Sequence, residues 1–402
     1  MRALAVGAMY PPHDLGGGYE ITWRSSVRHL RARGDEVRVL AGDFRAPDPD
    51  GPEDPDVHRE LRLYWRDHDF PRLSWRERIA LERHNAAVLA RHVEEFRPDV
   101  LCWWQLGGTS IALVEHGRRA GLPAVGVIGD DWMGWGPRLD GWLSPFRSRP
   151  RLARLAERAT GLPARVDFGG AAEWLFNSEH TRRRALAAAG PLPRTAVAHP
   201  GVDTALFRPA PEPDGWRWRL LYLGRLDERK GVHLAVEALA SWPAETVLTL
   251  QGAGDAGYVE QLRRRAEALG VPERLRFSSA PRAEIPRVYA EADAVLFPVQ
   301  WAEPWGLVPL EAMAVGRPVV ATGTGGSGEY MRHEDNCLLI DPADSADALA
   351  GAVTRLAGDA ALRGRLRESG LRTAAPFTEE AYNDAIAAAL DAAAGVRASA
   401  PR

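Results

Sequence analysis

The chain has 402 residues, of which 45% are hydrophobic and 26% are charged, and its formal net charge is −3. This composition is typical of a soluble globular protein, and the length predicts two domains of roughly 150–200 residues. A weakly negative chain does not attract phosphate backbones through bulk charge, so we expect no nucleic-acid partner.

The two cysteines, Cys102 and Cys337, lie far apart and form no CxxC spacing. This excludes a disulfide framework or a zinc ribbon and fits a reducing compartment. The opening stretch MRALAVGAMYPPHD predicts a first strand rather than a signal peptide, and no apolar run reaches the roughly 18–20 residues that span a bilayer. We expect a cytoplasmic protein, with contact to the inner face of a membrane left open.

The first half of the chain alternates strand and helix patterns. Residues 2–8 (RALAVGA) predict a buried strand, and a helical pattern over about 19–33 stops at Gly34, a residue suited to a left-handed helix cap. Further strands are expected at 36–41, 100–103 and 124–128, with a helix at 111–119. A βαβ series of this kind predicts a parallel, doubly wound sheet.

A proline-rich segment at 199–216 interrupts this alternation and predicts a hinge. Strands are then expected at 219–223, 246–251, 275–278, 294–299 and 318–321, alternating with helices at 232–240, 258–269, 285–290 and 307–315. The predicted fold class is α/β, with two Rossmann-like parallel-sheet domains that face each other across a cleft. The expected domains are 1–205 and 206–376, with a C-terminal helix in 377–402 that packs back on the first domain.

The sequence GRLDERKG (residues 224–231) follows a predicted strand and carries Arg225 and Lys230. A turn at the carboxyl end of a parallel strand is where a diphosphate binds in such sheets, and these two cations suit it. A solvated charged loop is the alternative, and this stretch alone does not decide between them.

The sequence EPWGLVPLE (residues 303–311) occupies the same position on a later unit. Gly306 allows the backbone to approach a ligand, and the helix that begins near Leu307 offers free N–H groups to an anion. Eight helical steps rise about 12 Å, whereas glycosidase carboxylates lie about 5–9.5 Å apart. The spacing therefore favours a pair of glutamates, Glu303 and Glu311, that bind hydroxyl groups on opposite sides of a bound diphosphate. The alternative is two unrelated surface acids.

These motifs carry a resemblance to a known family. GRLDERKG, HPGVD and FPVQWAEPWGLVPLEAMAVGRPVVATGTGG resemble the donor domain of family-4 glycosyltransferases with the GT-B fold, whose E-x7-E signature matches Glu303 and Glu311. YPPHDLGGGYEITWRSSVRHLRARGDEVRVL resembles the glycine loop and first helix of the family. The likeness covers nearly the whole chain and is strongest over 219–342.

The resemblance implies a hexosyltransferase that moves a hexose-type sugar, with retention, from a nucleotide diphosphate donor to a hydroxyl acceptor. It implies front-face attack with no cofactor and no metal in the chemical step. By position it assigns Glu303 to the donor sugar, Arg225 and Lys230 to the diphosphate, and Glu311 to the ribose. Its remaining donor contacts fall on the backbone of Gly306, Leu307 and Val308, on Arg282 near the base, and on Gly17 and Gly18 in the first domain.

One position departs from the family pattern. The family usually has histidine after the strand expected at 124–128, whereas this chain reads VIGDDWMGW with Asp130 at that place. An aspartate can accept a proton or bind a donor hydroxyl, so Asp130 remains a catalytic candidate. The pair Asp130–Asp131 is weak support for a metal site. His13 is an alternative polar contact or an ordinary loop residue.

Two further stretches allow binding interpretations. Trp104, Trp132 and Trp135 lie near predicted strand ends, where aromatic rings could form a platform for the acceptor. The alternative is core packing, which we expect for at least half of the tryptophans of this region. Residues 146–165 hold six arginines and one acid, with leucines at helical spacing. That segment suits an anionic lipid or acceptor, or a solvated helix face.

The donor base stays open between UDP, GDP and dTDP, and the acceptor between a small molecule, a lipid carrier and a glycan. The competing interpretations are a sugar-nucleotide epimerase or phosphorylase, and a non-catalytic partner subunit that binds a nucleotide sugar. Oligomeric state is not specified by the sequence.

Overall fold

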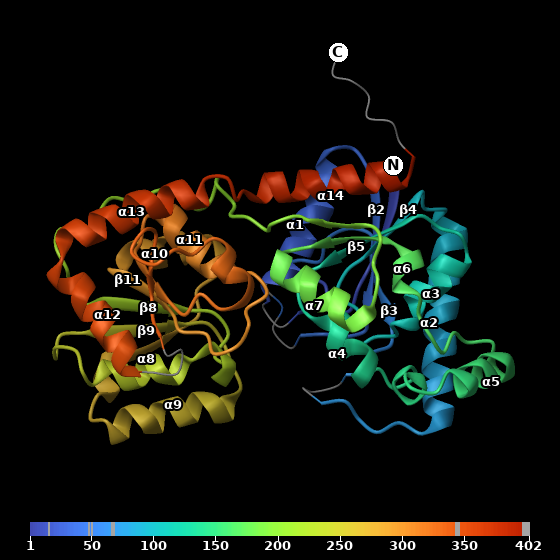
Figure 1. Cartoon of the computed structure of the whole chain (residues 1–402), viewed down its shortest axis with the longest axis horizontal. Coiled ribbons are helices and arrows are strands. Elements are labelled where there is room, and N and C mark those ends of the chain that lie inside the picture. Colours follow the sequence, from blue (N-terminus) through green and yellow to red (C-terminus); the bar gives the residue numbers. More distant parts are fainter. Residues whose placement is uncertain (15–16, 47–48, 50, 66–68, 342–345, 396–402) are drawn as a thin grey trace, which may run out of the picture. The chain divides into compact units, whose positions relative to one another are not determined.

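The computed structural model describes residues 1–14, 17–46, 49, 51–65, 69–341 and 346–395. The chain forms two compact units, residues 1–199 with 382–402, and residues 200–381. Each unit is built on a parallel sheet covered by helices (Figure 1), which confirms the predicted α/β class. The divisions fall at 199/200 and 381/382, a few residues from the expected 205/206 and 376/377.

The first unit contains a seven-stranded parallel sheet in the order β3-β2-β1-β4-β5-β6-β7. Its strands are β1 (Arg2–Val6), β2 (Glu36–Gly42), β3 (Val57–Leu61), β4 (Val100–Trp103), β5 (Ala124–Ile128), β6 (Glu173–Phe176) and β7 (Thr195–Val197). In register, Leu4 of β1 lies opposite Arg38 of β2 and Leu101 of β4. Every residue of β4 and β5 is buried, as expected for central strands covered on both faces.

Helices cover both faces of this sheet. They are α1 (Gly18–Ala32), α2 (Trp75–Phe96), α3 (Ala112–Arg119), α4 (Trp132–Leu139), α5 (Pro150–Thr160), α6 (Phe168–Ala171), α7 (Glu179–Ala189) and α14 (Glu379–Ala393). Val88 of α2 and Leu113 of α3 belong to one apolar core. Trp23 of α1 and Ile386 of α14 belong to a second core, which also includes Ala5 of β1. The two cores give the unit its three-layer architecture.

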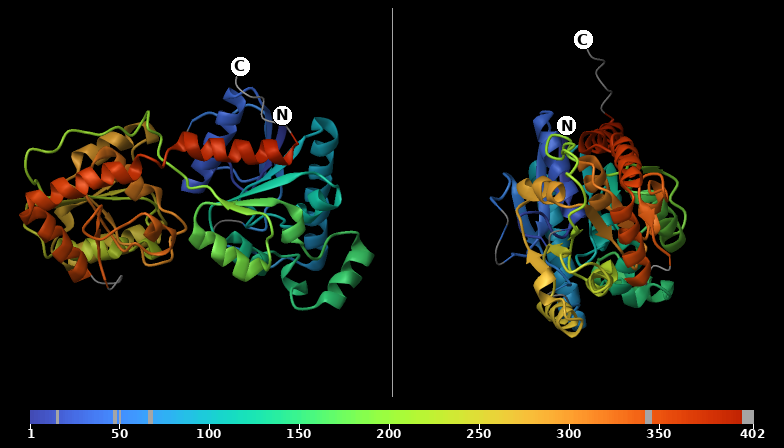
Figure 2. Two further views of the ribbon diagram at one scale, coloured as in Figure 1. Left: turned by 45° about the horizontal axis from the view of Figure 1, so that its top comes forward. Right: turned by 90° about the vertical axis from the view of Figure 1, so that its left-hand side faces the viewer.

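The C-terminal helix α14 packs on the first unit beside α1 (Figure 2). The Ser26 hydroxyl donates to Asn383 Oδ1 at 2.6 Å, and Asn383 Nδ2 donates to the Ser25 hydroxyl at 2.8 Å. Arg33 forms an ion pair with Asp391 at 2.8 Å. Residues far apart in sequence therefore share one core and one polar network.

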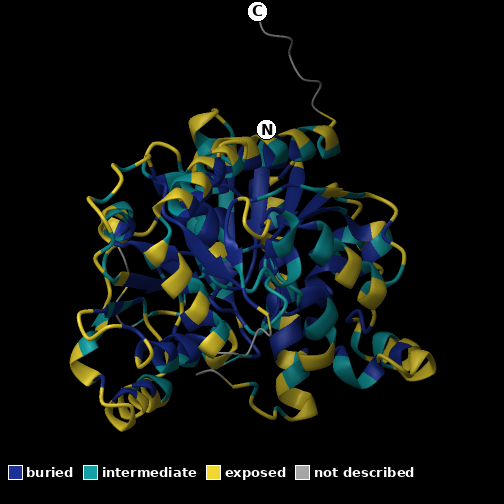
Figure 3. Cartoon of the chain, turned by 60° about the vertical axis from the view of Figure 1, so that its left-hand side comes forward, coloured by how far each residue is buried: buried dark blue, intermediate teal, exposed yellow. Residues whose placement is uncertain are grey.

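The second unit contains a six-stranded parallel sheet in the order β10-β9-β8-β11-β12-β13. Its strands are β8 (Arg219–Leu223), β9 (Val247–Gln251), β10 (Leu275–Ser278), β11 (Ala294–Phe297), β12 (Val319–Ala321) and β13 (Leu338–Leu339). Its helices are α8 (Val232–Leu239), α9 (Ala256–Ala268), α10 (Ile285–Glu291), α11 (Leu307–Val315), α12 (Ala346–Gly358) and α13 (Ala360–Ala374). The central strands β11 and β12 are buried throughout, whereas helices expose one side to solvent (Figure 3).

None of the described helices combines the length and the apolar character that crossing a bilayer requires.

Candidate functional site

The loop after β8 carries the cations of GRLDERKG. Arg225 is exposed, and its Nη2 lies 3.6 Å from Asp227 Oδ2. Gly231, at φ +69°, precedes α8, and a Cβ there would lie 1.9 Å from the Pro298 carbonyl oxygen. Only glycine allows this close approach, which brings Lys230 to the loop that follows β11.

Glu303 lies in that loop and accepts two hydrogen bonds on one oxygen. Its Oε2 is 2.6 Å from Lys230 Nζ and 2.8 Å from Trp301 Nε1. The ammonium also lies 5.2 Å from the centroid of the Trp301 ring, a cation–π distance. All three side chains are half-buried. The structure therefore brings together two of the sequence-predicted residues and adds Trp301, which sequence reasoning missed.

The helix that follows begins at Leu307 directly after Gly306, which has φ +87°. No side chain caps this end of α11, so its first backbone N–H groups have no intrahelical partner. The Gly306 carbonyl accepts a hydrogen bond from the Tyr330 hydroxyl at 2.6 Å, which fixes the turn. The helix start, including the amides of Leu307 and Val308, has the form of an anion site beside Glu303.

Glu311 lies deeper in α11 and is 2% exposed. Its Oε1 is 2.6 Å from Arg282 Nη2, and its Oε2 accepts a hydrogen bond from the Tyr289 hydroxyl at 2.9 Å. Burial raises the pKa of Tyr289 well above its ordinary value, so the phenol keeps the proton that it donates. The structure thus pairs the predicted residues Arg282 and Glu311. A ribose hydroxyl that binds Glu311 has to share it with these two donors.

In the first unit, Asp130 follows β5 and is half-buried. Its Oδ1 accepts a hydrogen bond from the Trp132 backbone N–H at 2.8 Å. Burial, and secondarily the charge of Asp131, raise the pKa of Asp130 to about 7. Asp131 does not converge with it on a common point, because its own Oδ2 pairs with Arg184 at 2.7 Å. The arrangement gives an acid that titrates near neutrality rather than a pair of metal ligands.

The glycine loop is described only in part. Gly17 caps α1, and Gly18 is the first residue of that helix, while Gly16 lies outside the described residues. A Cβ at Gly17 would lie 2.1 Å from the Glu20 carboxylate, which is the movable end of a flexible side chain. His13 accepts a hydrogen bond from the Ala46 backbone N–H at 3.2 Å and thereby links the loop after β1 to the loop after β2.

The structure corrects the expected acceptor platform. Trp104 and Trp132 are 1% and 0% exposed, so neither ring has a face to offer an acceptor. Trp104 stacks on Trp23 at 5.8 Å in the core between sheet and helix, and Trp132 packs against Trp174. A position near a strand end therefore did not distinguish a binding tryptophan from a core tryptophan. Trp135 is half-buried and remains a candidate.

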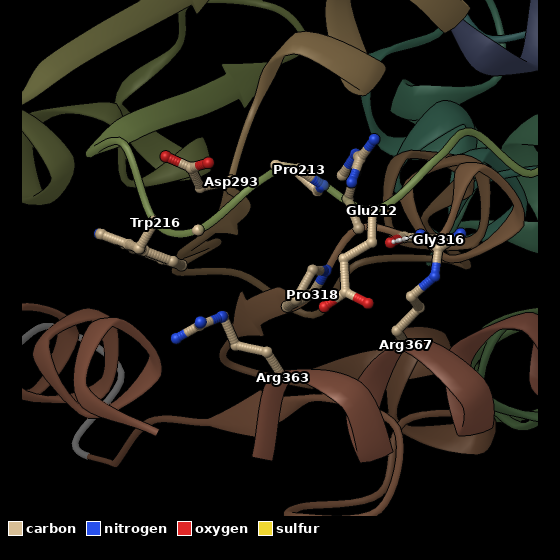
Figure 4. A pocket seen from close by; sticks show the side chains of 10 residues that line it. Glu212, Pro213, Trp216, Asp293, Gly316, Pro318, Arg363 and Arg367 are labelled. Atoms are coloured by element: carbon tan, nitrogen blue, oxygen red, sulfur yellow. Dashed lines mark hydrogen bonds between the residues drawn. The ribbon is translucent and has the colours of Figure 1, made fainter. Parts of the chain in front are cut away.

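A separate pocket of the second unit contains none of the sequence-predicted residues (Figure 4). Arg317 and Arg367 line it, and both donate to backbone carbonyls: Arg317 Nη2 to Pro211 at 2.8 Å and Arg367 Nη1 to Gly316 at 2.7 Å. Its free volume of about 20 Å³ has room for one water molecule. Through Pro211 and Ala210, these arginines hold the proline-rich segment 199–216 in place, a structural role.

Two Rossmann-like parallel-sheet units define the GT-B fold class, and solved structures of that class match nearly the whole chain. The structure of Anabaena Alr3699/HepE in complex with UDP and glucose covers 97% of this chain and 99% of that one, with a TM-score of 0.70 and 22% identity. WaaG, a glycosyltransferase involved in lipopolysaccharide biosynthesis, covers 97% and 99%, with a TM-score of 0.68 and 21% identity.

Sequence comparison gives the family. The family described as "Glycosyltransferase Family 4" matches residues 16–206, and "Glycosyl transferases group 1" matches residues 203–373. The lipopolysaccharide core biosynthesis glycosyltransferase LpsE of Rhizobium meliloti is 31% identical over 290 residues, 68% of this chain and 77% of that protein. The chain belongs to the family-4 glycosyltransferases and is a glycosyltransferase of GT-B fold.

A second group of relatives matches a smaller part. The GDP-mannose-dependent alpha-(1-6)-phosphatidylinositol monomannoside mannosyltransferase of Mycobacterium tuberculosis is 34% identical over 200 residues. That match covers 45% of this chain and spans about half (51%) of the relative.

Proposed function

We propose that this enzyme transfers a hexose-type sugar from a nucleoside diphosphate sugar to a hydroxyl acceptor with retention of configuration. The observation that carries the proposal is the shared oxygen of Glu303, which binds both Lys230 Nζ and Trp301 Nε1 beside the uncapped start of α11. The Glu303 carboxylate, which can bind sugar hydroxyls, and the Lys230 ammonium, which can bind phosphate oxygens, therefore lie next to a helix N-terminus. The sugar and the diphosphate of a nucleotide sugar require these two kinds of group.

The proposed reaction breaks the bond between the anomeric carbon and the diphosphate oxygen. The bonding electrons leave with the diphosphate, and the acceptor oxygen bonds to the anomeric carbon on the same face. The acceptor proton passes to the departing phosphate oxygen. Lys230, Arg225 and the amides of Gly306–Val308 meet the developing negative charge, and fixed donors of this kind are each worth about 10²–10³ in rate. In this proposal the protein's own cations do this without a metal ion.

The relatives support a nucleotide sugar as the class of donor, but they do not identify the donor of this enzyme. HepE was solved with UDP and glucose and with UDP-glucose, and the mycobacterial mannosyltransferase is GDP-mannose-dependent. We therefore propose UDP-, GDP- or dTDP-linked hexoses as donors. Small molecules, lipid carriers and glycans are the proposed acceptor classes.

Thermal unfolding with each nucleotide sugar tests the donor. A ligand that binds only the folded protein stabilises it by RT ln(1 + [L]/Kd), about 2.7 kcal/mol at 100 times Kd. One nucleotide series is expected to raise Tm, and the corresponding sugar is then expected to appear on an acceptor with its configuration retained. Donor turnover that needs no acceptor, or donor binding without transfer to any acceptor class, would contradict the proposal and favour the epimerase, phosphorylase or binding-subunit alternatives.

We also propose that the enzyme works at the cytoplasmic face of a membrane, held there by α5. This helix turns apolar side chains outward: Leu152 is 48% exposed and Leu155 62% exposed, while Ala153 faces the core. The exposed cations of the same segment are Arg147, Arg149, Arg151, Arg154 and Arg158. Leucines flanked by arginines are complementary to acyl chains beneath anionic headgroups, where each cation contributes about 1 kcal/mol.

The double variant Leu152→Ser/Leu155→Ser is expected to lower partitioning onto phosphatidylglycerol vesicles at least tenfold, because it removes the apolar part of α5. Vesicle flotation measures this, and high salt is expected to weaken binding of the wild-type protein. Leu269→Ser is the matched control, since Leu269 is 39% exposed on the second unit. Equal flotation of the wild type and the double variant would rule out the proposed contact.

A further inference from the structure

Two histidines and a glutamate meet on the first unit, outside every group assigned above. His58 and Glu60 lie two residues apart on β3, so their side chains point to the same side of the strand. His92 comes from α2, which packs against β3. One ligand atom from each residue lies within 4.8 Å of the others.

The distances match those of a metal-binding set. Glu60 Oε1 is 3.5 Å from His58 Nδ1 and 3.4 Å from His92 Nε2. Ligands bound to Zn²⁺ at about 2.0–2.1 Å in a tetrahedron lie about 3.3 Å from one another. Two of the three separations therefore already have the length that a common ion would impose.

Neighbouring side chains orient two of these groups. His58 Nε2 lies 2.7 Å from Asp56 Oδ1, which leaves Nδ1 as the nitrogen that faces Glu60. A carboxylate that holds the far nitrogen of an imidazole is the usual outer partner of a metal-binding histidine. Arg91 binds the other carboxylate oxygen of Glu60, Oε2. Oε1 is therefore the oxygen directed at both histidines.

His92 is the most buried member of the cluster. Its side chain is fully buried, Nδ1 has no hydrogen-bond partner among the described residues, and Nε2 has only the 3.4 Å ion-pair contact with Glu60 Oε1. A buried polar group without a well-formed hydrogen bond is destabilising. Coordination by an ion would bond Nε2 directly.

We propose that His58, Glu60 and His92 bind a divalent transition-metal ion of the Zn²⁺ type. Two imidazoles and one carboxylate suit Zn²⁺, Co²⁺ or Ni²⁺ better than Mg²⁺ or Ca²⁺, which take oxygen ligands. Three protein ligands leave one position for water. The ion links α2 to β3, the edge strand of the sheet, so its effect is on the stability of this unit, and the sugar-transfer chemistry proposed above does not involve it.

Titration of the tag-free, metal-stripped full chain with Zn²⁺ tests the site. Calorimetry is expected to show one Zn²⁺ bound per chain at this site, with a rise in Tm. His58→Ala and Glu60→Gln are expected to weaken binding at least tenfold and to abolish the Tm rise. Co²⁺ absorption in the visible range is expected to report a four-coordinate ion in the wild-type protein and to be lost in both variants.

His84→Ala is the matched control, because His84 lies on α2 and contacts the backbone oxygen of Glu60 (Nε2···O 2.8 Å) without facing the cluster. This variant is expected to keep wild-type affinity. Both His58 and Glu60 are half-buried, so their variants are expected to fold, which circular dichroism verifies. Wild-type affinity in His58→Ala and Glu60→Gln, or no Zn²⁺ binding by the wild-type chain, would overturn the proposal.

Discussion

Glu303→Gln and Lys230→Ala are each expected to lower the rate of sugar transfer by about 10²–10³-fold. In the proposed mechanism Lys230 supplies the charge next to the leaving diphosphate and Glu303 holds the sugar. Glu303 also fixes the ammonium of Lys230 at 2.6 Å. Because each side chain positions the other, the double variant is expected to lose little more than either single variant. Release of nucleoside diphosphate in the presence of acceptor measures the rate.

Glu237→Gln is the matched control for this pair. Glu237 forms an ion pair with Arg265 at 2.7 Å on the helical surface of the same unit. Its loss is expected to leave the transfer rate unchanged and to alter stability by less than about 1 kcal/mol. Wild-type rates in Glu303→Gln and Lys230→Ala, with all variants folded, would remove both residues from the proposed site.

The transfer rate is expected to fall about tenfold for each pH unit below 7, because burial raises the pKa of Asp130 to about 7. We propose in addition that the ionised carboxylate of Asp130 accepts a hydrogen bond from a sugar hydroxyl, in place of the family's usual histidine. Asp130→Asn removes the ionisation and is expected to give a low rate that does not change between pH 5 and 8. A variant with a wild-type pH profile would contradict this role.

The free energy of unfolding is expected to fall as pH rises, whereas the transfer rate is expected to rise. The pKa of Asp130 in the folded protein lies above its ordinary value of 3.8, so the unfolded chain ionises first and stability falls as pH rises from about 4 to 7. Asp130→Asn keeps the acceptor for the Trp132 N–H and avoids that loss. Its stability advantage over wild type is expected to grow by about 1–2 kcal/mol between pH 5 and 8, after allowance for partial exposure. A constant stability difference between the two proteins over this pH range would contradict the raised pKa of Asp130.

The parts of the fold that sequence patterns predicted well are the buried ones. β8 and α11 have the predicted bounds, since β8 is a short apolar run and α11 is marked by Gly306 and Gly316 at its ends. β3 was not predicted because VHREL is an edge strand with polar side chains, which has no continuous apolar run. The neighbouring α2 carried a usable signal: Ser74 and Glu77 form a capping box at its start.

The candidate site was predictable as separate motifs but not as a set of contacts. The loop positions of Lys230 and Glu303 follow from the strand–helix alternation, yet their hydrogen bond joins residues 73 positions apart. Tyr289 and Trp301 were missed because no local pattern marks a phenol or an indole as a partner of a glutamate. For Trp104, residue type suggested a sugar platform, whereas burial depends on packing between distant elements.

The position of α14 has a consequence for biosynthesis. Residues 200–381 form one unbroken stretch, so the second unit leaves the ribosome with every part of its core. The first unit begins to emerge earlier, but it lacks Tyr382, Ile386 and Leu390 until all of residues 200–381 have been synthesised. A nascent chain of this enzyme therefore carries an uncovered apolar face while the second unit is being made. The domain that is made first is the last to be completed.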